Sequence, residues 1–264
     1  MNYILSLETI SYTGFADISN NTFIDTDISY DEIGLPMIKS RRIKGLLKES
    51  CIEIMELKEK SDSEMQTICN ILFGEKGKTE GCIKWGNFYV ADYKKIKEEI
   101  IQYNQQHNTT IPAYFCQSVH TETISSTAIH HANKSAIHNS LRTIRVLQPA
   151  KKLVAHIIID TDKTSEAFTY FKLAVKNLQE GGINRNRGLG NFILTLEEDP
   201  SMETKMSLNI DLDNIQDNDT IQLIYETIQP IVIPNFGSDP NTIQSADILP
   251  GNLLRGVFAK FAKK

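Results

Sequence analysis

A ten-residue loop rich in glycine and arginine, Gly181 to Gly190, constrains the fold of this chain more than any other stretch. It contains four glycines, two arginines and no acidic residue. A helical pattern precedes it and the strand-like run 191–196 follows, so the loop must turn the chain from a helix into a strand. Glycine adopts positive φ and lets the backbone approach a ligand, exposed amides in such loops form anion-binding concavities, and arginine suits phosphate. The pattern predicts either a cradle for an anion or a sharp turn with solvated arginines.

Residues 37–48 form a second basic stretch that lacks acidic residues. The stretch carries five basic residues, and Ser40 is the predicted N-cap of a helix whose apolar face includes Ile43 and Leu47. The free amides and the dipole at a helix start already favour anions. Cations placed there gain nothing from the dipole, so they indicate a ligand. The alternative is an ordinary solvated helix face.

Residues 123–159 form a third basic stretch, with no Asp or Glu but with five Lys or Arg and four His residues. Its first half is polar and rich in small residues, so it can contribute little to a core. We therefore expect a long excursion from the fold, which is either functional or disordered. Residues 141–159 return to strand character. If the fold brings the three stretches to one face, an acidic molecule would carry the basic stripe that a phosphate backbone needs.

Hydrophobic periodicity predicts the other elements. Alternation predicts strands over 3–12 and 83–90. Apolar stripes predict helices over 61–73, 91–103 and 164–180. An acidic, turn-rich segment lies between the first strand and the first helix and contains Asp25, Asp27 and Asp31.

Composition limits the classes of partner and compartment. The net charge of −5 argues against nucleic acid unless a basic surface is local. The N-terminus lacks the features of a signal peptide, and no apolar stretch approaches the ~20 residues that span a bilayer. We therefore expect a cytoplasmic protein without a membrane partner. The four cysteines are scattered and are predicted to be reduced thiols; the spacing does not support a zinc site from Cys82, Cys116 and a histidine.

The chain also contains an internal repeat. Residues 221–228 repeat the alternation and the Glu-Thr-Ile of residues 4–10. Residues 249–260 repeat the Leu-Pro and the basic-Gly step of residues 35–48. The second copy stops at Lys264, so we expect either a fragment or a partner that completes the second half.

An ordered set of motifs resembles the RAMP superfamily of CRISPR effector proteins. The set comprises Gly34-Leu35-Pro36 followed by Arg42-Ile43-Lys44-Gly45-Leu46-Leu47-Lys48-Glu49, then Phe73-Gly74 before a strand, then the loop 181–190. The runs 25–27, 30–36, 127–129 and 140–147 sharpen the resemblance toward the double-RAMP subunit of type III systems, especially III-D, which takes the place of the Cas-five type subunit. It covers residues 1–196 and part of 220–264. Residues 37–40 depart from the family's usual Ile-Pro-Gly-Ser, whereas the second copy keeps Pro250-Gly251.

The resemblance implies an α+β fold. Residues 1–200 would form a ferredoxin-like (RRM-like) RAMP domain with a thumb at about 105–150, and residues 201–264 a linker and a partial second RAMP-like repeat. Such a subunit grips CRISPR RNA by its backbone or 5′ handle and assists recognition of target RNA. Its partners would be CRISPR RNA, target RNA, other RAMP subunits and a large polymerase-like subunit. The implied RNA-binding residues are Lys39, Arg41, Arg42, Lys44, Lys134, Arg142, Arg145, Gly182, Asn184, Arg185, Arg187, Gly188 and Gly190.

Whether the chain is an enzyme stays open from the sequence. Backbone RAMP subunits can cut target RNA with one loop aspartate, and Asp25 lies at the matching place, with Asp27 and Asp31 close enough in sequence to help hold a divalent ion such as Mg²⁺. Three acids in a solvated turn are the alternative. No resident metal and no other cofactor are predicted.

Three other functions compete with this one. A metal-independent nuclease that processes the guide precursor would use His130, His131 or His138 as general base, with Lys134 or Arg142 stabilising the phosphorane. Surface histidines are the alternative. A mononucleotide-binding enzyme predicts a Gly-Lys-Ser/Thr loop after a strand, whereas the glycine loop 181–190 follows a helix. A purely structural scaffold also stays open.

Overall fold

The structure, a computed structural model, describes residues 1–17, 23–75, 77–162, 165–199, 231–233 and 245–261. The chain divides into two compact units, Met1–Met206 and Ser207–Lys264, and each is described by itself. The predicted domain boundary at residue 200 lies outside the described residues and stays a prediction. Mixed helices and antiparallel strands agree with the predicted α+β class.

The first unit is built on an antiparallel sheet with the strand order β11-β1-β10-β7-β3-β2. A further short strand, β6, also pairs with β10. In β10 alternate residues are buried, from Leu153 to Ile159, as the period of a half-covered strand requires. The bounds are β1 Asn2–Thr9, β2 Ser29–Tyr30, β3 Pro36–Ile38, β6 Ile83–Trp85, β7 Phe88–Val90, β10 Lys152–Ile159 and β11 Phe192–Glu198.

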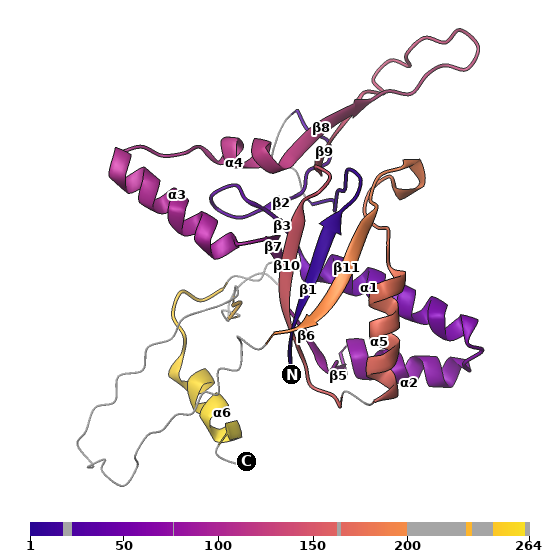
Figure 1. The fold of residues 1–264 in the computed structure, drawn as a ribbon, viewed down its shortest axis with the longest axis vertical. Coiled ribbons are helices and arrows are strands. Elements are labelled where there is room, and N and C mark those ends of the chain that lie inside the picture. Colours follow the sequence, from indigo (N-terminus) through magenta and orange to yellow (C-terminus); the bar gives the residue numbers. More distant parts are fainter. Residues whose placement is uncertain (18–22, 76, 163–164, 200–230, 234–244, 262–264) are drawn as a thin grey trace. The chain divides into compact units, whose positions relative to one another are not determined.

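Helices α1 (Ser40–Leu57), α2 (Asp62–Phe73) and α5 (Glu166–Asn177) pack on one face of this sheet (Figure 1). Their apolar faces and the inner strand residues form the main core, in which Leu5, Leu47 and Phe171 are fully buried. A smaller core holds α3 (Tyr93–His107) and α4 (Ala113–His120) near the other edge of the sheet.

Two of the differences from the predicted elements are explained by contacts with distant residues. Ser40 is the first helical residue of α1 and not its N-cap, because the cap position is taken by Lys39. The amide N–H of Ser40 donates to Asn87 Oδ1 at 2.9 Å, so a side chain from a distant loop satisfies this helix start. The predicted strand 83–90 is interrupted at Gly86, where its amide bonds His156 O and β6 ends.

The polar excursion is an ordered β-hairpin. Strands β8 (Thr121–Ser126) and β9 (Arg142–Leu147) pair along their whole length and project from the main sheet, with residues 127–141 at the tip (Figure 1). Disorder, one of the two predicted outcomes, is therefore wrong for the hairpin strands. Cross-strand backbone hydrogen bonds hold the ladder, which needs little apolar burial.

Few residues of the second unit are described. Helix α6 (Gly251–Phe261) starts directly after Pro250, at the place where the repeat predicts a helix. The predicted strand 221–228 lies outside the described residues. None of the helices described in the chain combines the length and apolarity needed to cross a membrane. All four cysteines are free thiols, as predicted, and burial raises the pKa of Cys51 to about 12.

Candidate nucleic-acid interface

Residues 12–17, which we call the central segment, follow β1 and contact all three basic stretches. The first contact is with the glycine loop. Tyr12 O accepts the Gly190 amide at 2.8 Å, and Gly14 O accepts the Ile183 amide at 2.8 Å. The loop is thereby fixed to the end of the central strand of the sheet.

The neck of the glycine loop requires glycine. Gly181 N donates to Gly190 O at 2.9 Å, which closes the neck. A Cβ on Gly182 would lie 2.2 Å from Gly14 O, and one on Gly190 would lie 2.2 Å from Gly181 O. Both residues also have positive φ, at +92° and +83°. Only a residue without a side chain fits such close backbone contacts.

The closed neck leaves an exposed turn. Asn184 has a left-handed conformation, and residues 185–187 form a short 3₁₀ helix that ends at Gly188. Both arginines of this turn, Arg185 and Arg187, are exposed. Their exposure and the fixed neck together present two cations on a rigid support.

The start of α1 makes the second contact. Arg42 Nη2 donates to Ala16 O at 2.5 Å, and Lys39 forms an ion pair with Asp17. Arg41 is exposed, whereas Lys44 is half-buried. The α1 residue Leu46 also packs on the loop neck, because a Cβ on Gly181 would lie 2.4 Å from its Cδ1.

The base of the β8–β9 hairpin makes the third contact. Thr13 and Leu147 exchange two backbone hydrogen bonds, of 3.1 and 2.7 Å. A Cβ on Gly14 would lie 3.1 Å from Val146 of β9 and 2.9 Å from Ile183 of the glycine loop. Gly14 therefore lies where the hairpin and the glycine loop meet.

The three candidate aspartates have different surroundings. Asp25 is exposed, its Oδ2 accepts the Thr143 amide at 2.7 Å, and its own amide donates to Thr143 O. Asp27 is buried and pairs with Arg145 at 3.3 Å. Asp31 accepts the amides of two following residues and the Tyr93 hydroxyl. The last two carboxylates are therefore committed to protein donors, and only Asp25 is exposed enough to meet a ligand.

The Asp27 environment also holds a perturbed phenol. Tyr30 Oη donates to Asp27 Oδ1 at 3.3 Å, and Arg145 Nη1 lies 3.4 Å from the same hydroxyl. Burial raises the pKa of Tyr30 to about 12, although the nearby guanidinium opposes the shift. Arg145 also donates to Gln117 of α4. Its guanidinium thus ties the hairpin base to α4 and to the segment that follows Asp25.

The hairpin tip holds the remaining candidates. The side chains of His130, His131, His138 and Lys134 are exposed, and Arg142 is exposed at the start of β9. No ion pair or side-chain hydrogen bond involves these three imidazoles within the part of the chain that the structure describes. The tip is held instead by small polar groups, such as the 2.7 Å contact between Thr127 Oγ1 and Ser140 Oγ.

Apart from the half-buried Lys44, the predicted cations fall into two groups. Lys39 and Arg145 hold the internal carboxylates Asp17 and Asp27. The exposed cations are Arg41, Arg42, Lys134, Arg142, Arg185 and Arg187. Among the described residues, no group of three His, Cys, Asp or Glu side chains is placed to hold a metal ion. Sequence reasoning missed the central segment, for which Gly14 was the one available signal.

Comparison with known proteins gives a likeness of fold. No family model matches the sequence, and no curated protein matches it significantly. A chain of the type III-B Cmr-beta complex bound to cognate target RNA superposes with a TM-score of 0.53 at 12% identity, covering 74% of this chain and 97% of that chain. A chain of the apo state of Cmr-beta gives the same values. The described fold is therefore shared with a subunit of a type III-B complex.

Proposed function

We propose that this chain is an RNA-binding RAMP subunit of a type III CRISPR effector complex, acting in antiviral interference in the cytoplasm. The fold supports the proposal. The strand order β11-β1-β10-β7, with α1 after β1 and α5 between β10 and β11, is consistent with the proposed ferredoxin-like domain. The likeness to a subunit of Cmr-beta, a complex solved with target RNA, agrees with this assignment.

One observation carries the RNA-binding part of the proposal. The three acid-free basic stretches, far apart in sequence, all contact the central segment. A chain with a net charge of −5 therefore gathers exposed cations around one segment. This local excess of positive charge is the electrostatic requirement for a phosphate backbone.

The predicted residues have two proposed roles: some would contact the RNA, and others would position the interface. Arg185 and Arg187, on the closed glycine loop, and Arg41 and Arg42, at the helix start, would face the sugar-phosphate backbone. Lys39 and Arg145 would act as positioning residues, since their charges are taken up by Asp17 and Asp27. Contacts from Lys44, Lys134, Arg142, Asn184 and the loop glycines stay predictions of the same interface.

The finer assignment is also a proposal. The β8–β9 hairpin, with its exposed basic tip, is the candidate thumb that would meet the guide or the guide–target duplex. The repeat in α6 favours a double-RAMP subunit of the III-D kind. The proposed partners are CRISPR RNA with its 5′ handle, target RNA, neighbouring RAMP subunits and a large polymerase-like subunit.

The RNA interface has a direct test. The double substitution Arg185→Ala and Arg187→Ala removes two exposed cations and leaves the glycine neck unchanged. The slope of log affinity for single-stranded RNA against log salt should fall in magnitude by about 1.4, because each arginine that neutralises a phosphate accounts for about 0.7 of it. Fluorescence anisotropy of the full chain with labelled RNA at several salt concentrations measures this slope.

A matched control removes two exposed lysines from α3, as Lys94→Ala and Lys95→Ala. The Lys95 pair with Glu99 is long, at 3.9 Å, and solvent-exposed, so its removal has little effect on stability. The control should keep the wild-type slope. If the loop variant and the control bind RNA alike, the loop is only a turn and the interface lies elsewhere.

A second function, target RNA cleavage, rests on Asp25 alone. Asp25 is exposed, and the Thr143 amide orients its Oδ2. Carboxylates suit Mg²⁺, which would activate a nucleophile or stabilise the phosphorane. Asp25→Asn in a complex with guide and partners should lose target cutting but keep target binding. Unchanged cutting on a sequencing gel would remove Asp25 from consideration, and cleavage of repeat RNA by the isolated chain in EDTA would favour the histidine alternative instead.

A further inference from the structure

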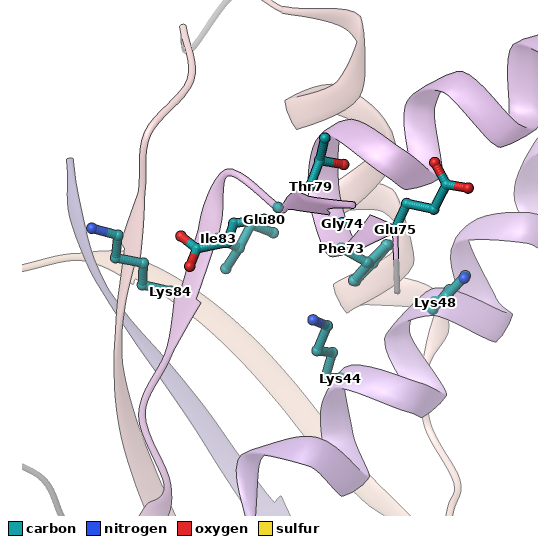
Figure 2. Close-up of a pocket in the computed structure, with 10 residues that line it drawn as sticks. Lys44, Lys48, Phe73, Gly74, Glu75, Thr79, Glu80, Ile83 and Lys84 are labelled. Atoms are coloured by element: carbon teal, nitrogen blue, oxygen red, sulfur yellow. The ribbon is translucent and has the colours of Figure 1, made fainter. Parts of the chain in front are cut away.

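A cleft of about 760 Å³ lies beside α1, and Lys44 is the one lining residue that it shares with the interface above. Its walls are α1, the end of α2, the small hairpin of β4 (Gly74–Glu75) and β5 (Thr79–Glu80), and β6. Figure 2 shows Lys44 and Lys48 rising from α1 below this hairpin, whereas the side chain of Lys84 on β6 points away from them. The cleft therefore brings two lysines of α1, Lys44 and Lys48, together.

The acidic and basic side chains that line the cleft differ in their ion pairing. Glu75 is paired with Lys78 at 2.7 Å, and Glu80 is the other acid of the lining. None of the ammonium groups of Lys44, Lys48 and Lys84 forms an ion pair with a residue that the structure describes. Lysines that gather without protein partners at a concave surface favour an anionic ligand.

A line of cations connects this cleft to the helix start. Arg41, Lys44 and Lys48 are spaced three and four residues apart, so they lie on one face of α1. Arg41 belongs to the basic stretch beside the central segment, and Lys48 belongs to the cleft. The face thus leads from the proposed RNA interface into the cleft.

A glycine lies on the same helical face. Gly45 is in the interior of α1, where glycine is less favourable than alanine. A Cβ built on it would meet nothing within 4 Å among the described residues, so packing within the chain gives no reason for glycine. Gly256, its counterpart in the repeat, is equally open. A bare backbone between cations permits the close approach of a ligand.

From these observations we propose that the RNA strand continues past the helix start along the Arg41–Lys44–Lys48 face, over Gly45, and places a phosphodiester in the cleft beside Lys44 and Lys48. This inference rests on the proposed RNA-binding function and extends its path. The flexible lysine ammonium suits a phosphate oxygen as a point charge. The nearby Glu80 would limit the strength of the contact, so Glu80→Gln should bind RNA more tightly.

The test uses a residue outside the interface already proposed. In the full chain, Lys48→Ala should lower the magnitude of the salt slope for single-stranded RNA by about 0.7 and weaken binding about 5-fold at 0.1 M salt, by extension of that slope to 1 M. Lys94→Ala is the matched control. A slope equal to that of the control would overturn the cleft contact.

Gly45→Leu tests the proposed RNA path independently. The substitution places a side chain on the open face of α1 and changes no charge. It should raise the melting temperature, since leucine is the better helix former, and it should weaken RNA binding. A more stable protein with wild-type affinity would overturn the path over Gly45.

Two further outcomes separate this inference from the proposed function. If the wild-type chain binds no RNA, the proposed function itself fails. If adenosine monophosphate competes for the cleft as strongly as RNA does, and only through Lys44 and Lys48, the cleft is a mononucleotide site and the proposed path is wrong.

Discussion

The glycine loop and the tip of the β8–β9 hairpin are both exposed and basic, but they are held in different ways. The loop neck is closed by backbone hydrogen bonds to its own ends and to the central segment, at distances that exclude any Cβ. The tip, residues 127–141, is held by contacts among its own small polar groups, including Asn133, Ser135 and Ser140.

This difference indicates two roles for similar charges. A backbone-locked loop loses little conformational entropy on binding, so its arginines suit a fixed register on a phosphate backbone. An exposed tip with only local contacts can adjust to its partner. The boundary between the two regimes lies within β9, where Arg145 and Thr143 join the hairpin to the segment of Asp25 and Asp27.

The largest expected effect concerns the neck of the glycine loop, which backbone contacts hold in place. Gly182→Ala would force a Cβ to within 2.2 Å of Gly14 O at a φ of +92°. We expect the free energy of unfolding to fall by at least about 3 kcal/mol, from backbone strain plus displacement of the central segment. Gly188→Ala is the matched control, since it has positive φ but no atom within 4 Å of its Cβ, and should lose only about 1–2 kcal/mol. Equal losses in urea unfolding would show that the neck is not locked.

The next effect locates the boundary between base and tip. Arg145→Ala leaves the buried Asp27 carboxylate without its cation, and because both side chains keep some exposure we expect a loss of about 2–3 kcal/mol. Arg142→Ala, three residues toward the tip and exposed, should change stability by less than about 0.5 kcal/mol. If chemical denaturation shows a comparable loss of unfolding free energy for both variants, Arg142 is also held by contacts outside the hairpin tip.

The smallest expected effect is a pH dependence of the unfolding free energy that arises from Tyr30, beside Arg145 of the hairpin. The pKa of Tyr30 is raised from 10.0 to about 12, so the folded state keeps this proton to higher pH than the unfolded state. The resulting stability is complete below pH 10 and is lost as the pH rises toward 12. Tyr30→Phe should therefore flatten the fall in unfolding free energy over this range, by less than about 1 kcal/mol near pH 11.

A control is needed because Tyr93 has a pKa raised to about 12 as well. Tyr103→Phe, an exposed position on α3, should leave the alkaline limb of the stability curve unchanged. A Tyr30→Phe curve that coincides with this control would mean that the Tyr30 phenol is not buried as described.

Much of the fold was predictable because periodicity reports burial directly. The alternation in residues 152–159 and the apolar stripe of residues 61–73 each gave the right element, and the helix of 164–180 was recognised although it is shorter, from Glu166 to Asn177. The break at Gly86 and the capping of α1 by Asn87 were not predictable, because each depends on a strand or loop far away in sequence.

The candidate site was predictable in outline only. The absence of acids marked the three basic stretches, but charge alone does not show which cations have internal partners. Arg145 and its partner Asp27 are 118 residues apart, so this ion pair left no local pattern. The central segment acts through backbone carbonyls, which every residue has, and its side chains therefore gave little signal.

The contacts of the central segment determine when, during synthesis of the chain, the interface can form. Tyr12 O, near the start of the chain, accepts the amide of Gly190, near the end of the first unit. Strand β1 is synthesised first, yet its partners β10 and β11 and the glycine loop come last. Loop closure over such separations is slow. A nascent chain on the ribosome therefore cannot close the glycine loop onto the central segment until about residue 191 has emerged.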